Sequence, residues 1–499
     1  MLPVPIFVLL VAMRVLFVNP LLPVLCMVMS LAADAQVLSF SNTPRINQRG
    51  GYNRVLGEND AGIYLLRLRN AEGRGVVSLE HYSHNMAFQH EKTYRLGAER
   101  LVKAYLLPQH CMLFTGAADR SRGVFTLSYK KLHVTLEEVA QKNGLLTFDR
   151  YDFYKDQVLA SADRSGKHWV FYADSRDGQG RQVLDIALLD SSMTPLNREQ
   201  KILDVSADAF RLLDLETDPE GNVYLLASEQ QRDKRKTDPE SVRVVLYQYT
   251  SSGQRWSRID LSRGEVFING ARMVYNDSLS EMVVAGFYSA QNPDGADGVF
   301  IYTARRDGME RPRIQTAFST DFVAGIVGAR QADVSNTLNN FRIRKMIPRS
   351  DGGMVLVAER YYVTQRVETT YISGISQTNT TNYYHHDEVI LLSLDAVGTM
   401  EWQEVIRKRQ SALLGASQFS GIGVCALQDG VVVLYNEQGN GDVIQVHFQK
   451  NGSRSQRILL RSETSLTALF TAEGAQTGYN RLVLPCLRNK QISLLKLTY

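Results

Sequence analysis

The chain has 499 residues, 44% of them hydrophobic and 22% charged, and its 56 basic and 52 acidic residues give a formal net charge of +4. This composition excludes disordered, collagen-like and coiled-coil proteins, because each needs a bias in charge, glycine or heptad residues that is absent here. A balance this near neutral shows no electrostatic signature of binding to nucleic acid or an anionic membrane, so we expect no nucleic-acid partner.

The first element in chain order is a predicted export signal over residues 1–35. Residues 7–31 are almost continuously apolar and precede Ala33-Asp34-Ala35, the small-x-small pattern that signal peptidase accepts. Met13 is a possible true start, because Arg14 would then supply the positive charge in front of the apolar core. We therefore expect export to the periplasm, the cell surface or the medium.

The mature chain, residues 36–499, has no run that approaches the ~18 consecutive apolar residues of a membrane-spanning helix, so we expect no transmembrane segment after signal removal. Its three cysteines, Cys111, Cys425 and Cys486, each lie within an apolar run. A cysteine in such a run usually behaves as a small buried hydrophobic residue. We expect these thiols to be buried and inert, without a disulfide framework or a zinc site.

A repeat organises the mature chain. Its clearest copy has strand-like runs at residues 352–359, 388–395 and 400–406, with a tight turn at Ala396-Val397-Gly398. The middle run of this unit recurs eight times, beginning at Val76, Val124, Val183, Val242, Val299, Val389, Val443 and Ile492. Six of the seven intervals are 48 to 59 residues long and one is 90. Strands at this period predict an all-β fold, a β-propeller of four-stranded antiparallel blades.

Eight blades are predicted, with seven as the alternative. No Pro/Ser-rich linker interrupts the repeats, so residues 36–499 are expected to form a single propeller domain. The last repeat ends at Tyr499 without a successor, while the strand-like run Val37 to Ser41 has no partner nearby. We expect this N-terminal strand to pair with the last blade and close the ring, which removes an exposed sheet edge.

Two irregular features stand between the strands. Phe318, Phe322 and Val323 begin a helically spaced apolar pattern after Ser319 or Asp321 as N-cap, which predicts a helix covering one rim of the ring. Four Asp-Gly segments are interpreted as turns rather than calcium loops, because they lack the ligand alternation of a calcium hand. They occur at residues 163–166, 218–221, 294–298 and 351–353.

The longest interval contains an insertion of about 36 residues beyond the period, centred on residues 361–387. Long insertions in compact folds are often binding loops, and tyrosine supplies large, stiff contact surfaces with polar tips. An extended hairpin that continues two strands past the ring is the structural alternative, and both descriptions can hold. The candidate binding residues are Tyr361, Tyr362, Arg366, Tyr371, Tyr383, Tyr384, His385 and His386.

We predict no metal at His385-His386-Asp387-Glu388, because successive strand residues point to opposite faces and cannot all reach one ion. The sequence also lacks a Gly-x-Ser-x-Gly elbow, a His-Glu-x-x-His motif and a phosphate-binding glycine loop. Catalytic residues are therefore not assigned, and no cofactor is expected.

Several motifs within residues 339–410 resemble those of uncharacterised exported propeller proteins of Bacteroidota-type bacteria. The motifs are Arg342 to Arg344, Asp351 to Gly353, Val357 to Tyr362, Glu401-Trp402 and Lys408-Arg409-Gln410. The signal ending Ala-Asp-Ala-Gln is also similar. This resemblance implies an exported propeller and no known activity.

Two hypotheses about function follow. The favoured one is an exported, non-catalytic binding or scaffold propeller that engages a protein or glycan of the cell envelope through the Tyr-rich insertion and one ring face, as a monomer or in a hetero-complex. The alternative is a carbohydrate-active or other hydrolytic enzyme with a site in the axial funnel, where a cluster of carboxylates or histidines would then be found.

Overall fold

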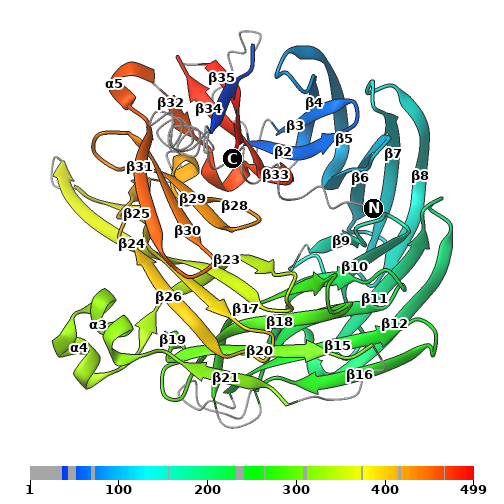
Figure 1. Ribbon diagram of the computed structural model, residues 1–499. Coiled ribbons are helices and arrows are strands. Elements are labelled where there is room, and N and C mark those ends of the chain that lie inside the picture. Colours follow the sequence, from blue (N-terminus) through cyan, green and yellow to red (C-terminus); the bar gives the residue numbers. More distant parts are fainter. Residues whose placement is uncertain are drawn as a thin grey trace, which may run out of the picture.

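The computed structural model describes residues 36–42, 52–68, 74–155, 157–231, 241–262, 266–306, 312–372, 375–413, 417–465, 467–489 and 491–499. The predicted signal over residues 1–35 lies outside the described residues. The described chain is almost entirely strand, and Figure 1 shows its antiparallel sheets arranged in a ring. The protein is an all-β propeller, as the repeat predicted.

The first sheet has seven strands in sequence order. They are β2 (Tyr52–Asn59), β3 (Gly62–Leu68), β4 (Arg74–Tyr82), β5 (Phe88–Leu106), β6 (His110–Asp119), β7 (Val124–His133) and β8 (Glu138–Asp149). The first half of β5 pairs with β4 and its second half with β6. One continuous strand thus links two groups of strands. The prediction of eight blades, or seven, stays a prediction.

Three four-stranded sheets follow. The first two contain β9 (Val158–Ala162), β10 (His168–Arg176), β11 (Arg181–Asp190), β12 (Pro195–Ser206), β13 (Phe210–Thr217), β14 (Val223–Gln230), β15 (Val242–Thr250) and β16 (Arg255–Asp260), with the 3-10 turn η1 (Ala207–Ala209) between them. The third contains β17 (Phe267–Asn276), β18 (Glu281–Ser289), β20 (Gly298–Ala304) and β21 (Ile314–Ala317). A two-stranded ladder joins β19 (Gly295–Ala296) to β22 (Leu338–Asn339).

Three sheets complete the ring. The first contains β23 (Phe341–Pro348), β24 (Met354–Ile372), β25 (Ile375–Leu394), β26 (Met400–Ile406) and the short β27 (Ser411–Leu413). The next contains β28 (Gly423–Ala426), β29 (Gly430–Asn436), β30 (Val443–Gln449) and β31 (Arg454–Leu460). The last contains β32 (Thr467–Leu469), β33 (Ala475–Gly478), β34 (Arg481–Arg488), β35 (Gln491–Thr498) and β1 (Val37–Phe40).

The middle strands are buried on both faces because each sheet packs between two neighbours. All seven residues of β3 are buried, as are six of the seven in β29. This explains why the apolar runs of the sequence do not alternate with polar residues. Cys111, Cys425 and Cys486 are free thiols, and all three are buried, as predicted.

The ring is closed by the N-terminal strand, as predicted. β1 pairs antiparallel with β35, from Val37 opposite Thr498 to Phe40 opposite Leu495. Ser41 continues the contact, because its N–H donates to Leu494 O at 3.0 Å and its Oγ accepts from Leu494 N at 2.8 Å. Strands from the two ends of the chain thus complete one sheet.

The predicted helix is α3 (Thr320–Val327), and the shorter α4 (Ala329–Val334) follows it at the outer edge of the ring (Figure 1). Ser319 is its N-cap, with Oγ accepting from Phe322 N at 3.3 Å. Short helical turns also occur at η3 (Ser417–Phe419), α5 (Ser462–Ser465) and η4 (Thr471–Glu473). No helix in the described part of the chain has the length and apolar character needed to cross a bilayer.

The Asp-Gly segments form turns, as predicted. Asp163 accepts the N–H of Ser165 at 2.7 Å, and Gly166 follows at a φ of 68°. Asp218 and Gly221 repeat this arrangement, with the N–H of Glu220 donating to Asp218 at 3.0 Å and a φ of 80° at the glycine. The carboxylates are thus engaged by the local backbone.

Candidate functional site

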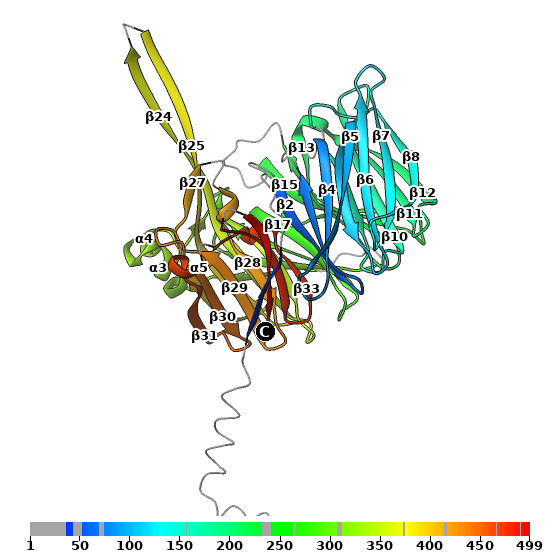
Figure 2. The same cartoon turned by 90° about the horizontal axis from the view of Figure 1, so that it is seen from above.

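The insertion at residues 361–387 forms the outer part of a long hairpin of β24 and β25. Pairing runs without a break from Tyr361 opposite His386 to Ile372 opposite Ile375. Figure 2 shows this hairpin projecting well beyond the rest of the ring. The backbone of the insertion is therefore the extended hairpin that we gave as the structural alternative, because its two strands continue past the ring.

Six of the eight predicted binding residues gather at the base of the hairpin. Tyr361, Tyr362, Tyr383, Tyr384, His385 and His386 are all half-buried there. Tyr362 stacks on His385 with ring centroids 4.4 Å apart, and Tyr361 meets the edge of His386 at 5.0 Å. The guanidinium of Arg342 lies 4.3 Å from the ring centre of Tyr361. Tyr361, Tyr362, His385 and His386 thus form a packed aromatic layer rather than a free loop.

The other two predicted residues lie farther out along the hairpin. Arg366 is exposed and forms an ion pair with exposed Glu368 at 2.8 Å. Tyr371 is near the tip, where its backbone pairs with Ser376. Between base and tip, Val363 and Val367 are 44% and 60% exposed. The outer hairpin thus presents apolar and polar side chains that no other described element covers.

A buried ion cluster holds the base of the hairpin. Glu359 is completely buried, and its carboxylate lies 2.7 Å from Arg344 Nη2, 2.8 Å from Lys408 Nζ and 3.0 Å from His386 Nδ1. Burial raises the pKa of Glu359, but the hydrogen bond with His386 and the charges of Lys408 and Arg344 outweigh it and bring the pKa to about 2. The ion pairs of Glu359 therefore hold the base of the hairpin in place.

The two histidines face opposite sides of β25. His385 contacts Tyr362 and lies 2.8 Å from Thr364 Oγ1, whereas His386 turns to Glu359. Within the described residues, no group of three or more His, Cys, Asp or Glu side chains is placed to hold a metal ion. His385 and His386 point to opposite faces because successive side chains alternate along a strand.

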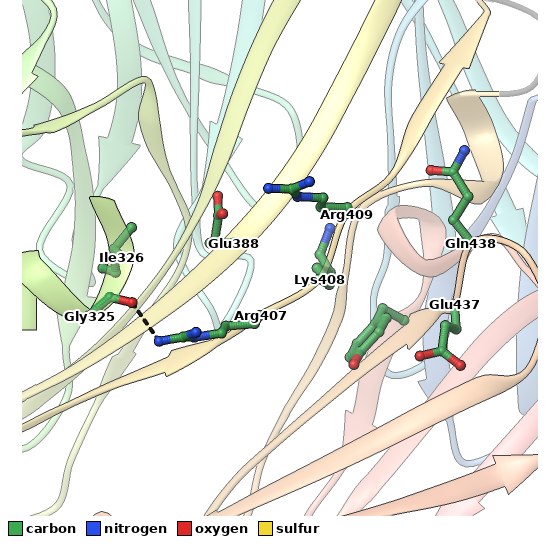
Figure 3. A pocket seen from close by; sticks show the side chains of 9 residues that line it. Gly325, Ile326, Glu388, Arg407, Lys408, Arg409, Glu437 and Gln438 are labelled. Atoms are coloured by element: carbon green, nitrogen blue, oxygen red, sulfur yellow. Dashed lines mark hydrogen bonds between the residues drawn. The ribbon is translucent and has the colours of Figure 1, made fainter. Parts of the chain in front are cut away.

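A groove of about 410 Å³ lies beside the hairpin base, between α3 and the sheet that contains β29 (Figure 3). Glu388, Arg407, Lys408, Arg409 and Glu437 line it. Arg407 donates to Gly325 O at 2.7 Å, whereas Arg409 is exposed and forms no hydrogen bond or ion pair with the described residues. Sequence reasoning did not select this groove. The run of three basic residues Arg407-Lys408-Arg409 is the sequence signal that could have indicated it.

A second candidate region lies on the inner strands. Asp214 and Glu216 occupy alternate positions of β13, so their side chains point to the same face. Ser161 Oγ donates to Glu216 Oε2 at 2.9 Å, and Met273 N donates to Asp214 Oδ2 at 3.1 Å. Burial, and then the charge of Asp214, raise the pKa of Glu216 to about 7. Sequence reasoning anticipated axial carboxylates as a class but not these two residues.

Comparison with models of protein families gave no match, and comparison with curated proteins gave none either. Solved structures gave matches. A protein of unknown function from Bacteroides caccae is 10% identical, with 71% of this chain and 93% of that chain covered and a TM-score of 0.29. The β-propeller domain of the Trilobed protease from Pyrococcus furiosus is 9% identical, with 81% and 94% covered and a TM-score of 0.34.

Prolyl oligopeptidase B from Galerina marginata is 8% identical, with 88% of this chain covered and a TM-score of 0.41. The match spans about half of that enzyme, 56% of its chain. At these identities, similarity bears on the fold alone.

Proposed function

We propose that this protein is an exported, non-catalytic binding propeller of the cell envelope, of the kind found in Bacteroidota-type bacteria. Removal of residues 1–35 releases the mature chain to the periplasm, the cell surface or the medium. The β24–β25 hairpin and the ring face on which it stands engage a protein or glycan.

One observation carries this proposal: the outer hairpin is a regular, anchored structure that contributes nothing to the core. Its strands are paired along their length, and its base is fixed by Glu359 and its three partners. Beyond the base, Val363, Arg366 and Val367 are exposed. An exposed extension of this length is a liability unless it meets a partner, because its unpaired strand edges invite association. A pre-ordered surface of this kind also loses little conformational entropy on binding.

The test is to shorten the hairpin without touching its base. Residues 366–381 are replaced by Asn-Gly, which supports a tight two-residue turn and keeps the native pairing of Gln365 with Asn382. The wild-type and shortened proteins are compared for capture of envelope proteins and glycans, with thermal unfolding as the folding control. We expect partner capture to be lost while the unfolding midpoint stays within about 2 °C, since the removed residues bury little surface. Equal recovery of the same partners by both proteins would refute the proposal.

A matched control separates the hairpin from exposed surface in general. Val139 on β8 is 57% exposed, close to the 60% of Val367. Val139→Ser should leave capture unchanged, whereas Val367→Ser should weaken it.

The paired carboxylates of β13 favour one second candidate, a hydrolytic enzyme with its site on the inner strands. A group with a pKa near 7, such as Glu216, is suited to general acid catalysis, and Asp214 would be the second carboxylate that glycoside hydrolysis requires. Release of reducing ends from a panel of polysaccharides tests this candidate. Activity that is lost in Glu216→Gln would establish the enzyme and displace the binding proposal.

A further inference from the structure

Basic side chains gather on the inner strands of the ring. In Figure 1, β2, β17, β23 and β28 are among the strands nearest the centre. Contacts pass from inner strand to inner strand, from β2 to β5, β9, β13, β17 and β23. We call five of the basic residues on these strands the axial cations: Arg54, Lys103, Arg211, Arg272 and Lys345.

The axial cations lack the partners that other basic residues of this protein have. Arg54, Arg211 and Arg272 are exposed, and neither their side chains nor that of Lys345 form a hydrogen bond or ion pair with any residue that the structure describes. By contrast, the nearby Arg344 lies 2.7 Å from Glu359. The positive charge of these inner strands is therefore not neutralised by direct contacts.

Electrostatic coupling shows that these charges influence one another although they come from distant parts of the sequence. Burial lowers the pKa of Lys103, and the positive charge of Arg54 lowers it further. Burial also lowers the pKa of Lys345, and Arg164 adds to the effect. Asp214 and Glu216 are the acids that act on Lys103. Because the pKa of Glu216 is about 7, this residue supplies only part of a negative charge at neutral pH.

A groove of about 330 Å³ lies at the end of β23 and β24 remote from the hairpin tip, close to the axial cation Lys345. Ile347, two residues after Lys345, lines it, and so does Arg164, which forms an ion pair with Asp277 of the same lining. Its lining also includes the aromatic residues Trp402 and Tyr479, the latter 71% exposed. The amide side chains of Gln428, Gln449 and Gln476 complete this part of the lining. Aromatic faces and amides are suited to the faces and hydroxyls of sugar rings.

We propose that the inner strands bind an acidic oligosaccharide, a glycan with carboxylate or sulfate groups, whose anionic groups meet the axial cations and whose sugar rings reach the Trp402–Tyr479 groove. Like charges held close together repel one another, and a multivalent anion relieves this repulsion. Several cations spread over different strands match an extended ligand with several separate anionic groups. This site is separate from the hairpin and goes beyond the binding role proposed for it.

Isothermal titration with defined oligosaccharides tests the ligand class. Oligogalacturonate supplies carboxylates, a heparin oligosaccharide supplies sulfates, and maltohexaose is the neutral control. We expect at least one acidic oligosaccharide to bind, maltohexaose not to bind, and affinity to fall several-fold between about 0.05 and 0.3 M salt because ions screen the attraction. Equal binding of maltohexaose, tighter binding of a single-stranded oligonucleotide, or no binding of either acidic sugar would overturn the proposal.

Two triple variants with the same change in charge locate the site. Arg54→Gln, Arg272→Gln and Lys345→Gln remove axial cations, whereas Lys92→Gln, Arg95→Gln and Lys142→Gln remove exposed cations of β5 and β8 outside the axial set. The axial triple should weaken binding at least about tenfold, as expected for losing charge-assisted contacts, and the other triple less than about twofold.

Equal losses in the two triples would refute the axial site. Single variants Arg272→Gln and Lys345→Gln serve if the triple does not fold, and each should weaken binding. The hairpin-shortened protein should bind the acidic oligosaccharide as the wild type does, so that failure of one proposal leaves the other open to its own test.

Discussion

Replacing Glu359 by Gln should destabilise the protein strongly. The substitution keeps the size of the side chain but removes the charge that compensates buried Lys408 and its neighbours Arg344 and His386. The side chain of Lys408 is only 1% exposed, so water cannot replace the lost partner. Breaking a buried ion pair by removing one partner typically costs about 3–5 kcal/mol.

The pKa of Glu359 gives an independent magnitude. Its ordinary value is 4.5 and its value in the folded protein is about 2. This depression corresponds to about 3 kcal/mol of stability at neutral pH. Because the folded-state pKa is the lower one, the contribution is complete above about pH 4.5 and is lost as the pH falls toward 2. The difference between wild type and Glu359→Gln should therefore be constant from pH 7 to 5 and shrink below that.

Urea unfolding at several pH values, followed by fluorescence and circular dichroism, measures this difference. Glu368→Gln is the matched control, since Glu368 pairs with Arg366 on the same hairpin but both side chains are more than half exposed. We expect the control to change stability by less than about 0.5 kcal/mol. A Glu359→Gln protein as stable as the control, or a difference that grows on acidification, would refute the account of the hairpin base.

Three further predictions concern the ring. Deleting residues 36–41 removes β1 and exposes the edge of β35, so thermal stability should fall and light scattering should show association, whereas an unchanged monomer would contradict ring closure. The three described cysteines should not react with Ellman's reagent at pH 8 until guanidinium is added, because burial raises each thiol pKa to about 12; rapid labelling of the native protein would contradict their burial. Gly430→Ala should cost roughly 2 kcal/mol or more in urea unfolding, because a Cβ there would overlap the carbonyl oxygen of Phe448, whereas Gly253→Ala has open space and should be nearly neutral. Similar stability of the two alanine variants would contradict the packing described for β29 and β30.

The repeat could be recognised in the sequence because the middle strands of each sheet are buried on both faces and therefore appear as continuous apolar runs at a regular interval. The closing strand at Val37 and the helix after Ser319 could also be located, because a strand-like run and a helically spaced apolar pattern are both visible in the local sequence. The sequence did not indicate that β5 runs through two groups of strands, because a strand that changes partner midway has no local signature.

The candidate sites were harder to predict because they depend on which distant residues the ring brings together. Tyr361 and His386 are 25 positions apart and meet through hairpin register, which the tyrosine-rich composition alone does not specify. Glu359 resembles a surface residue in the sequence, and its burial follows from cations that three other segments supply. The axial cations extend from Arg54 to Lys345 in the sequence, and it is the ring that brings their strands together.

Site-specific photo-cross-linking measures most directly whether the hairpin is the recognition surface. A benzophenone amino acid is placed at Val367 on the outer hairpin and, in a separate protein, at Val139 on β8, two positions of nearly equal exposure. The protein is irradiated in the cells that produce it, and covalent adducts are resolved by mass. A discrete adduct from position 367 and none from position 139 is the predicted result. Adducts of the same kind from both positions, or from position 139 alone, would contradict a recognition role for the hairpin.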